Sequence, residues 1–339
     1  MTRILIIYTG GTIGMMHDPV TKVLMPLDFS QVIARVPELD RLDYSLSVHS
    51  FNPIIDSSNV SPEIWLALAK LIGENYDDYD GFVILHGSDT MAYSASMLSF
   101  LFRNLTKPVV FTGSQLPIGE IRTDAKENLI TAIEISAHKN GNVPMVPEVC
   151  IYFDYQLFRG NRSRKYNSEK FEAFHSPNYP ILAEAGVNLN FHNNNILKVP
   201  EGEFRIHEHL DTNIHVLKIF PGISLNTVQS IVQTPGLRAL VMETFGSGNT
   251  TTAPWFLKSI EDAIHKGIVV VDISQCEGGS VDMGRYETSR YLKDMGVVSG
   301  YDMTFEAAIT KLMFLLGHNY STDTIRNMVE TPLRGELSR

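Results

Sequence analysis

Residues 4–14 read ILIIYTGGTIG, and this stretch decides the fold of the chain. Its aliphatic run is typical of a strand that is buried on both faces of a sheet. The chain then turns at Gly10 and Gly11 and presents the hydroxyl of Thr12. Glycines allow a backbone to approach a ligand closely, and parallel α/β sheets bind ligands at the carboxyl ends of their strands. Thr12 is therefore a candidate nucleophile.

Two other interpretations of this turn stay open from the residues alone. Glycine-rich turns without any chemistry are common in α/β folds. A phosphate-binding loop is the second interpretation, but a Walker loop ends in Gly-Lys-Ser/Thr, and this run ends in Gly11-Thr12-Ile13-Gly14. The dinucleotide fingerprint is matched only in part. The pattern gives little support to nucleotide binding.

The composition is that of a globular protein with one large domain or two ordinary ones, since 339 residues contain 44% hydrophobic and 19% charged residues. A net charge of −10 argues against a nucleic-acid surface, which needs a basic face. Cys150 and Cys276 lie far apart and predict neither a disulfide framework nor a zinc site. No run approaches the length of a membrane span, and the first residues do not resemble a signal peptide. We expect a cytoplasmic protein.

Strand-like and helix-like segments alternate along residues 1–187, which predicts a larger N-terminal domain with a doubly wound, mostly parallel sheet. The expected strands are 4–8, 51–55, 81–85, 108–112 and 149–153, and the expected helices are 62–75, 91–103 and 124–138. An Asn-rich segment with Pro and Gly predicts a linker over 188–211. The alternation resumes over 212–339 and predicts a smaller C-terminal α/β domain. Its expected strands are 216–220, 239–243 and 268–273, and its expected helices are 225–233, 253–266, 304–316 and 323–328.

Polar residues follow each of the first four expected strands, and in a parallel sheet these ends lie along one edge. The four stretches are Thr9–Thr12, Asp56–Asn59, His86–Thr90 and Thr112–Gln115. Ser, Thr and Asp are also common helix caps, so capping alone explains any one of them. Four together favour a site that contains carboxylates, hydroxyls and glycine N–H groups.

A hydroxyl nucleophile needs an activating base or cation. His86 is not an evident base, because its position is equally compatible with a packed structural histidine. A basic cluster over residues 159–165 follows a strand and is able to deliver Lys165, although a solvated charged loop is the alternative.

These residues resemble the two signature motifs of the bacterial-type L-asparaginases. The motifs are TGGTIG at residues 9–14 and HGSDTMA at residues 86–92. The resemblance extends over nearly the whole chain through DSS (56–58), TGSQLP (112–117), RGNR (159–162), FPGI (220–223) and LRGEL (333–337). The last three are similar to the cytoplasmic, type I branch.

The resemblance implies an amidohydrolase that converts L-asparagine and water to L-aspartate and ammonia, with no metal or organic cofactor. Thr12 is then the nucleophile, Ser88, Asp89 and Lys165 form a second catalytic set, and the substrate is bound by Asp56, Ser57, Ser58, Ser88 and Asp89. The resemblance also implies a homodimer or a tetramer of two dimers. A glutaminase, a dual asparaginase and glutaminase, and a sensor that binds asparagine without cleaving it remain alternatives. One methylene separates asparagine from glutamine, and a pocket discriminates such a difference by only ~1–3 kcal/mol.

The sequence departs from the family pattern at three places. Ser88 stands where the family usually has threonine, and it keeps the hydroxyl. The lid segment 15–43 has no tyrosine, and Leu24 or a neighbour falls near the usual tyrosine position. Glu243 stands where type I relatives have an arginine that contributes to an allosteric asparagine site. We therefore expect absent or altered activation by substrate.

Overall fold

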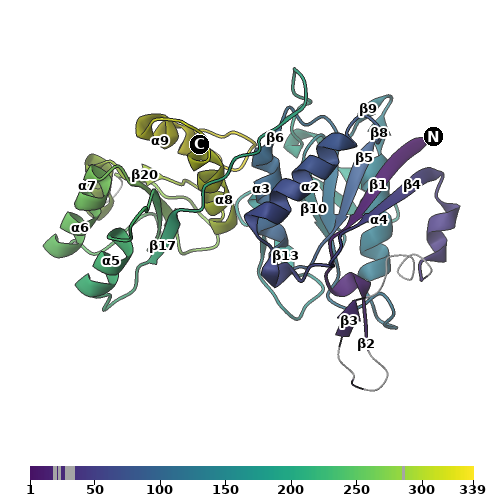
Figure 1. Cartoon of the computed structure of the whole chain (residues 1–339), viewed down its shortest axis with the longest axis horizontal. Coiled ribbons are helices and arrows are strands. Elements are labelled where there is room, and N and C mark those ends of the chain that lie inside the picture. Colours follow the sequence, from purple (N-terminus) through teal and green to yellow (C-terminus); the bar gives the residue numbers. More distant parts are fainter. Residues whose placement is uncertain (18–20, 22–23, 27–34, 285–286) are drawn as a thin grey trace. The chain divides into compact units, whose positions relative to one another are not determined.

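The computed structural model describes residues 1–17, 21, 24–26, 35–284 and 287–339 (Figure 1). The chain forms two compact units, Met1–His207 and Glu208–Arg339. Each unit encloses its own apolar core, which explains why each is compact by itself.

The first unit is built around an eight-stranded sheet in the order β15-β14-β11-β10-β7-β5-β1-β4. Five neighbouring strands are parallel, and three that follow β10 are antiparallel. The parallel strands are β1 (Thr2–Tyr8), β4 (Tyr44–Ser50), β5 (Gly81–Leu85), β7 (Val109–Thr112) and β10 (Val149–Phe153). The antiparallel strands are β11 (Gln156–Arg159), β14 (Ala183–Ala185) and β15 (Leu189–Phe191). The expected doubly wound, mostly parallel sheet is confirmed.

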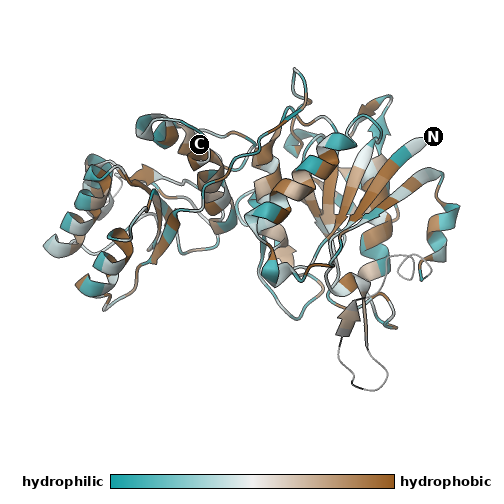
Figure 2. Cartoon of the chain, viewed as in Figure 1, coloured by the Kyte–Doolittle hydropathy of each residue, from teal (hydrophilic) through white to brown (hydrophobic). Residues whose placement is uncertain are grey.

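Helices cover the sheet because the central strands are apolar on both faces, as the hydropathy colours show (Figure 2). Ile4, Ile6 and Tyr8 share a core with Leu129 and Ile133 of α4 (Ala125–Ala137), which packs on β1, β5, β7 and β10. The intervening side chains of β1 point to the opposite face. Helices α2 (Pro62–Glu74) and α3 (Met91–Leu101) pack against each other, and α3 also packs on β10.

The strand order places a topological switch point between β1 and β5. The chain passes from β1 to its neighbour β4 on one side, and then crosses to β5 on the other side of β1. Ligands in open α/β sheets bind in the crevice at the carboxyl ends of the strands at such a point. The turns after β1 and β5 are therefore the favoured position for a site.

Short elements complete the first unit. They are η1 (Thr12–Gly14), β2 (Met15–His17), β3 (Leu24–Pro26), η2 (Pro37–Arg41), η3 (Ser57–Asn59), β6 (Phe102–Arg103), β8 (Lys139–Asn140), β9 (Val143–Pro144), η4 (Gly160–Arg162), β12 (Arg164–Lys165), β13 (Phe174–His175), η5 (Asn193–Asn195) and β16 (Arg205–Ile206).

Two sequence-based expectations need correction. Residues 51–55 are not a strand: the strand is β4 at Tyr44–Ser50, and Pro53 has no N–H with which to extend the ladder. Residues 188–207 are not a linker but part of the first unit, so the units divide four residues before the expected start of the second domain at 212. β15 extends the sheet edge and β16 pairs with β6, because backbone pairing outweighs the polar composition of this segment.

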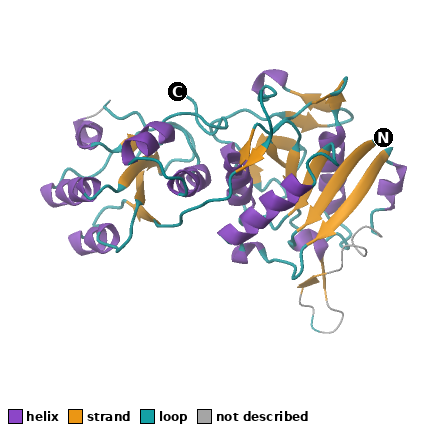
Figure 3. Ribbon diagram, turned by 45° about the horizontal axis from the view of Figure 1, so that its top comes forward, coloured by secondary structure: helices purple, strands orange, loops and turns teal. Residues whose placement is uncertain are grey.

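The second unit has a four-stranded parallel sheet whose strands follow chain order. Figure 3 shows its strands with helices around them. They are β17 (Ile214–Lys218), β18 (Ala239–Thr244), β19 (Val269–Ser274) and β20 (Val298–Ser299). Its helices are α5 (Leu225–Val232), α6 (Pro254–His265), α7 (Glu287–Met295), α8 (Phe305–Leu316) and α9 (Thr322–Val329). Helices α5 and α6 share one apolar core with the sheet, while α8 packs on β17 and β18 and α9 packs on β19 and β20.

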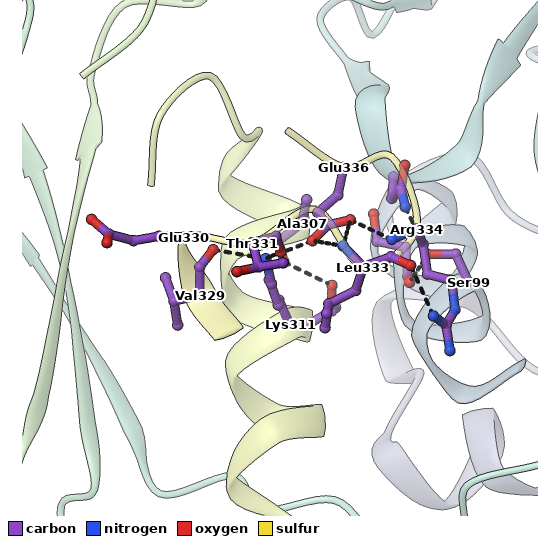
Figure 4. A network of polar contacts seen from close by, with 12 residues as sticks. Ser99, Ala307, Lys311, Val329, Glu330, Thr331, Leu333, Arg334 and Glu336 are labelled. Atoms are coloured by element: carbon purple, nitrogen blue, oxygen red, sulfur yellow. Dashed lines mark hydrogen bonds and ion pairs between the residues drawn. The ribbon is translucent and has the colours of Figure 1, made fainter. Parts of the chain in front are cut away.

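A buried ion pair holds the end of the chain against α8 (Figure 4). Lys311 Nζ lies 2.5 Å from Glu336 Oε1, and both side chains are almost fully buried. The same ammonium group donates to the carbonyls of Val329 and Thr331, and the Glu336 carboxylate accepts from the N–H of Leu333. Both charges are therefore hydrogen-bonded, as burial requires.

Among the described residues, no helix combines the length and the apolar character that crossing a bilayer requires.

Candidate active site

The turn after β1 carries Thr12 and has no room for a side chain at Gly11. A Cβ on Gly11, whose φ is 92°, would lie 2.5 Å from the backbone nitrogen of Gly87. The backbones of the β1 and β5 turns are thus in direct contact, which brings the segment of Thr12 next to that of Ser88. The Tyr8 hydroxyl lies below the turn and donates to the carbonyl of Gly14 at 3.1 Å.

The turn after residue 55 joins the same cluster. Ile55 N–H donates to the carbonyl of Thr9 at 2.7 Å. Thr90 Oγ1 donates to the carbonyl of Ser57, also at 2.7 Å, and connects the turn after β5 with η3. A Cβ on Gly87 would lie 2.6 Å from Ser57 Cβ, so these two turns also pack without a gap.

Lys165 reaches this cluster from β12, which follows the buried η4. Its ammonium nitrogen lies 2.8 Å from Ser88 Oγ and 2.7 Å from Asp89 Oδ1. The Lys165 side chain is only 16% exposed, whereas that of Asp89 is 67% exposed. The lysine, the serine hydroxyl and the carboxylate are therefore connected by hydrogen bonds, and Asp89 is the more solvent-exposed partner of the ion pair.

Asp56 caps η3, and its Oδ1 accepts from both the N–H and the hydroxyl of Ser58, each at 2.9 Å. Asp56 and Ser58 are exposed, but Ser57 is buried against Gly87. The carboxylate of Asp56 is thus held in one orientation at the edge of the cluster.

The fourth expected stretch, Thr112–Gln115, also reaches the cluster. His86 N–H donates to the carbonyl of Thr112 at 3.0 Å and continues the pairing of β5 with β7 beyond the strand. The structure therefore brings together all four polar stretches that follow the strands.

Leu24 and Glu243, which stand at two of the departures from the family pattern, are not among the residues that form this cluster. Leu24 pairs with His17 between β3 and β2, while residues 18–20, 22–23 and 27–34 of the lid segment fall outside the described residues. Glu243 lies in the second unit, where its carboxylate is 3.6 Å from Lys218 Nζ. Within the described part of the chain, no group of three or more His, Cys, Asp or Glu residues is arranged to hold a metal ion.

Sequence reasoning did not assign a role to Thr90 or to Gly87. Thr90 connects two of the turns through its hydroxyl, and Gly87 contacts both the Thr12 turn and Ser57. The only signal in the sequence was their position beside Ser88 and Asp89, because contacts between turns are not visible in a linear pattern.

Comparison with known proteins agrees with the order and spacing of the motifs. The family model of the asparaginase N-terminal domain matches residues 3–197, and the family model of the glutaminase/asparaginase C-terminal domain matches residues 213–329. The chain belongs to the asparaginase family. The matched ranges fall within the two units, so the family architecture accounts for both.

Relatives of the asparaginase family resemble the chain over nearly its full length. L-asparaginase 1 of Escherichia coli K12 is 42% identical over 99% of this chain and 98% of its own. The crystal structure of L-asparaginase I from Vibrio cholerae superposes with a TM-score of 0.91 at 41% identity and covers 100% of this chain and 99% of that one. The thermostable L-asparaginase from Thermococcus kodakarensis gives the same TM-score at 30% identity, with both chains fully covered.

Proposed function

We propose that this protein hydrolyses the side-chain amide of L-asparagine to give L-aspartate and ammonia. The observation that carries the proposal is the contact of the Thr12 turn with the turn that holds Ser88 and Asp89, at the switch point of the sheet. The similarity to L-asparaginases over both units supports the same reaction. The alternatives of a glutaminase and of a non-catalytic sensor gain no specific support.

In this proposal Thr12 Oγ1 attacks the amide carbonyl, and the bond to nitrogen breaks to leave a Thr12 ester. Lys165 contacts both Ser88 Oγ and Asp89 Oδ1. A proton is therefore able to pass between lysine and serine while Asp89 balances the charge. The proton removed from the threonine goes to the leaving nitrogen, which departs as ammonia. Water then hydrolyses the ester.

The backbone N–H groups of Thr12 and Ser88 are candidates for binding the oxyanion. Neither donates to another described residue. A donor of this kind contributes about 3 kcal/mol to transition-state stabilisation. Each of these N–H groups belongs to a residue whose side chain has a proposed role in the reaction. One pair of turns therefore supplies both the nucleophile and the electrostatic stabilisation.

The charges near the turns suit a zwitterionic amino acid. We assign the substrate ammonium to the carboxylates of Asp56 and Asp89, and the substrate carboxylate to the hydroxyls of Ser57, Ser58 and Ser88. The backbone N–H of Ser58 orients Asp56 before any ligand arrives, which lowers the entropic cost of binding.

The test is ammonia release from L-asparagine and, separately, from L-glutamine. Thr12→Ala should lower kcat by on the order of a thousandfold or more, because it removes the nucleophile. Thr106→Ala is the matched control, since Thr106 is also half-buried but hydrogen-bonds Tyr76 outside the cluster. Full activity in Thr12→Ala refutes the assignment. Asparagine binding without ammonia release by the wild type favours the sensor.

We further propose a cytoplasmic homo-oligomer, either a dimer or a tetramer of two dimers, because the motifs resemble the type I branch. Sedimentation velocity on the purified protein tests the assembly, and a monomer at micromolar concentration contradicts it.

A further inference from the structure

His86 is a fully buried histidine that lies directly before the reactive turn and that the proposed reaction does not use. Its side chain is enclosed, and the ring of Phe111 lies edge-on at 5.7 Å between centroids. Burial lowers the pKa of the imidazole to about 4, so the ring is neutral at physiological pH.

Three hydrogen bonds define the state of this ring. His86 Nδ1 lies 2.7 Å from the carbonyl oxygen of Gly87, which only accepts, so Nδ1 carries the proton. In the neutral ring Nε2 then has a lone pair and accepts from Ser94 Oγ at 2.9 Å. The Ser94 oxygen in turn accepts from Trp65 Nε1, which only donates, at 2.9 Å. Each donor in this series of hydrogen bonds therefore has an acceptor, and only the Nδ1–H tautomer of His86 satisfies all of them.

The hydrogen bond from His86 Nδ1 fixes the orientation of the Gly87 carbonyl, and this affects the backbone N–H of Ser88. The peptide group between Gly87 and Ser88 is planar, so fixing the carbonyl also fixes the direction of the Ser88 N–H. In a trans peptide this N–H points away from the carbonyl. The N–H of Ser88 donates to no other described residue.

We propose that His86 is a positioning residue, which orients the Ser88 N–H toward the oxyanion through its Nδ1–H bond to the Gly87 carbonyl. This inference rests on the proposed function for its catalytic consequence. The tautomer itself follows from the hydrogen bonds alone. Trp65 and Ser94 on α2 and α3 hold the ring, so the two helices set the geometry of the turn.

The experiment compares two substitutions of His86 with a matched control on the same strand. His86→Leu removes the donor, whereas the Nδ2 of Asn in His86→Asn occupies about the place of Nδ1 and is able to donate to Gly87. Phe82→Leu also changes a buried ring, but at the far end of β5. We expect kcat to fall about tenfold in His86→Leu with KM within about threefold, and to be largely restored in His86→Asn. Phe82→Leu should lower the melting temperature and leave kcat unchanged.

Equal losses of kcat in His86→Leu and His86→Asn, or wild-type kcat in a folded His86→Leu protein, overturn the proposal. A ¹⁵N-edited spectrum of the wild type supplies a readout that does not depend on activity. It should show His86 as a neutral Nδ1–H tautomer that does not titrate from about pH 5 to about pH 8. The Nε2–H tautomer or an imidazolium ring overturns the proposal. If the wild type releases no ammonia, the proposed function fails while the tautomer remains measurable.

Discussion

Asp272 offers a prediction in which the sign and the size of a pH effect both follow from the structure. This residue of β19 is buried in the second unit and accepts from Thr244 Oγ1 at 2.6 Å through Oδ1. Its Oδ2 has no partner among the described residues. Burial raises the pKa of the carboxyl to about 7, because the single bond from Thr244 offsets only part of the desolvation.

The raised pKa means that the folded protein binds a proton that the unfolded chain has released. The ordinary value is 3.8. Between that value and about 7, the free energy of unfolding therefore falls as the pH rises. Each pKa unit corresponds to about 1.4 kcal/mol, so the loss from about pH 5 to about pH 8 is about 3 kcal/mol. Asp272→Asn removes this loss, because the amide does not ionise.

The assay is urea-induced unfolding in a Trp65→Phe background. Of the two tryptophans in the chain only Trp255 then remains, and it reports on the second unit. The unfolding free energy of Asp272→Asn minus that of its parent should rise by about 3 kcal/mol from about pH 5 to about pH 8. This difference cancels the titration of all other groups.

Asp211→Asn is the control, because the pKa of the Asp211 carboxyl is lowered whereas that of Asp272 is raised. Burial opposes ionisation of Asp211, but hydrogen bonds from Asn213 and Arg238 outweigh it and lower the pKa. Its titration therefore lies below the tested range, and its free-energy difference should stay constant. A constant difference for Asp272→Asn as well refutes the reasoning about burial.

Three further predictions concern the reactive turns, the buried ion pair and the Glu243 position. Gly87→Ala should reduce kcat at least tenfold, because its Cβ meets Ser57, whereas Gly186→Ala, whose nearest contact is 3.9 Å away, should leave kcat unchanged. Lys311→Met should lower the free energy of unfolding by about 3–5 kcal/mol in urea, since it leaves Glu336 charged and buried, and adding Glu336→Gln should recover part of the loss. Initial rates should follow a hyperbola in asparagine concentration, because Glu243 presents a carboxylate already paired with Lys218; a sigmoidal curve that flattens in Glu243→Ala contradicts this.

The central strands and the long apolar helices were predictable because burial leaves a periodic trace in the sequence, whereas β4 was expected at 51–55 and α7 was not expected at all. Fully apolar runs such as residues 81–85 became central strands, and glycines and hydroxyls after them became turns at one sheet edge. The expectation failed where polar composition was taken for a linker. Residues 189–191 pair with β14 through backbone groups, which any sequence possesses.

The sequence by itself determined the residue types of the candidate site, their order along the chain and the class of sheet that carries them. Only the tertiary structure decided that Gly11 contacts Gly87, that Lys165 meets Ser88 and Asp89 across more than 70 residues, and that His86 is locked in one tautomer. The physical reason is that periodicity records which side chains are buried, whereas contacts between turns depend on strand order and on distances of a few ångströms. Neither quantity is written in the local pattern of residues.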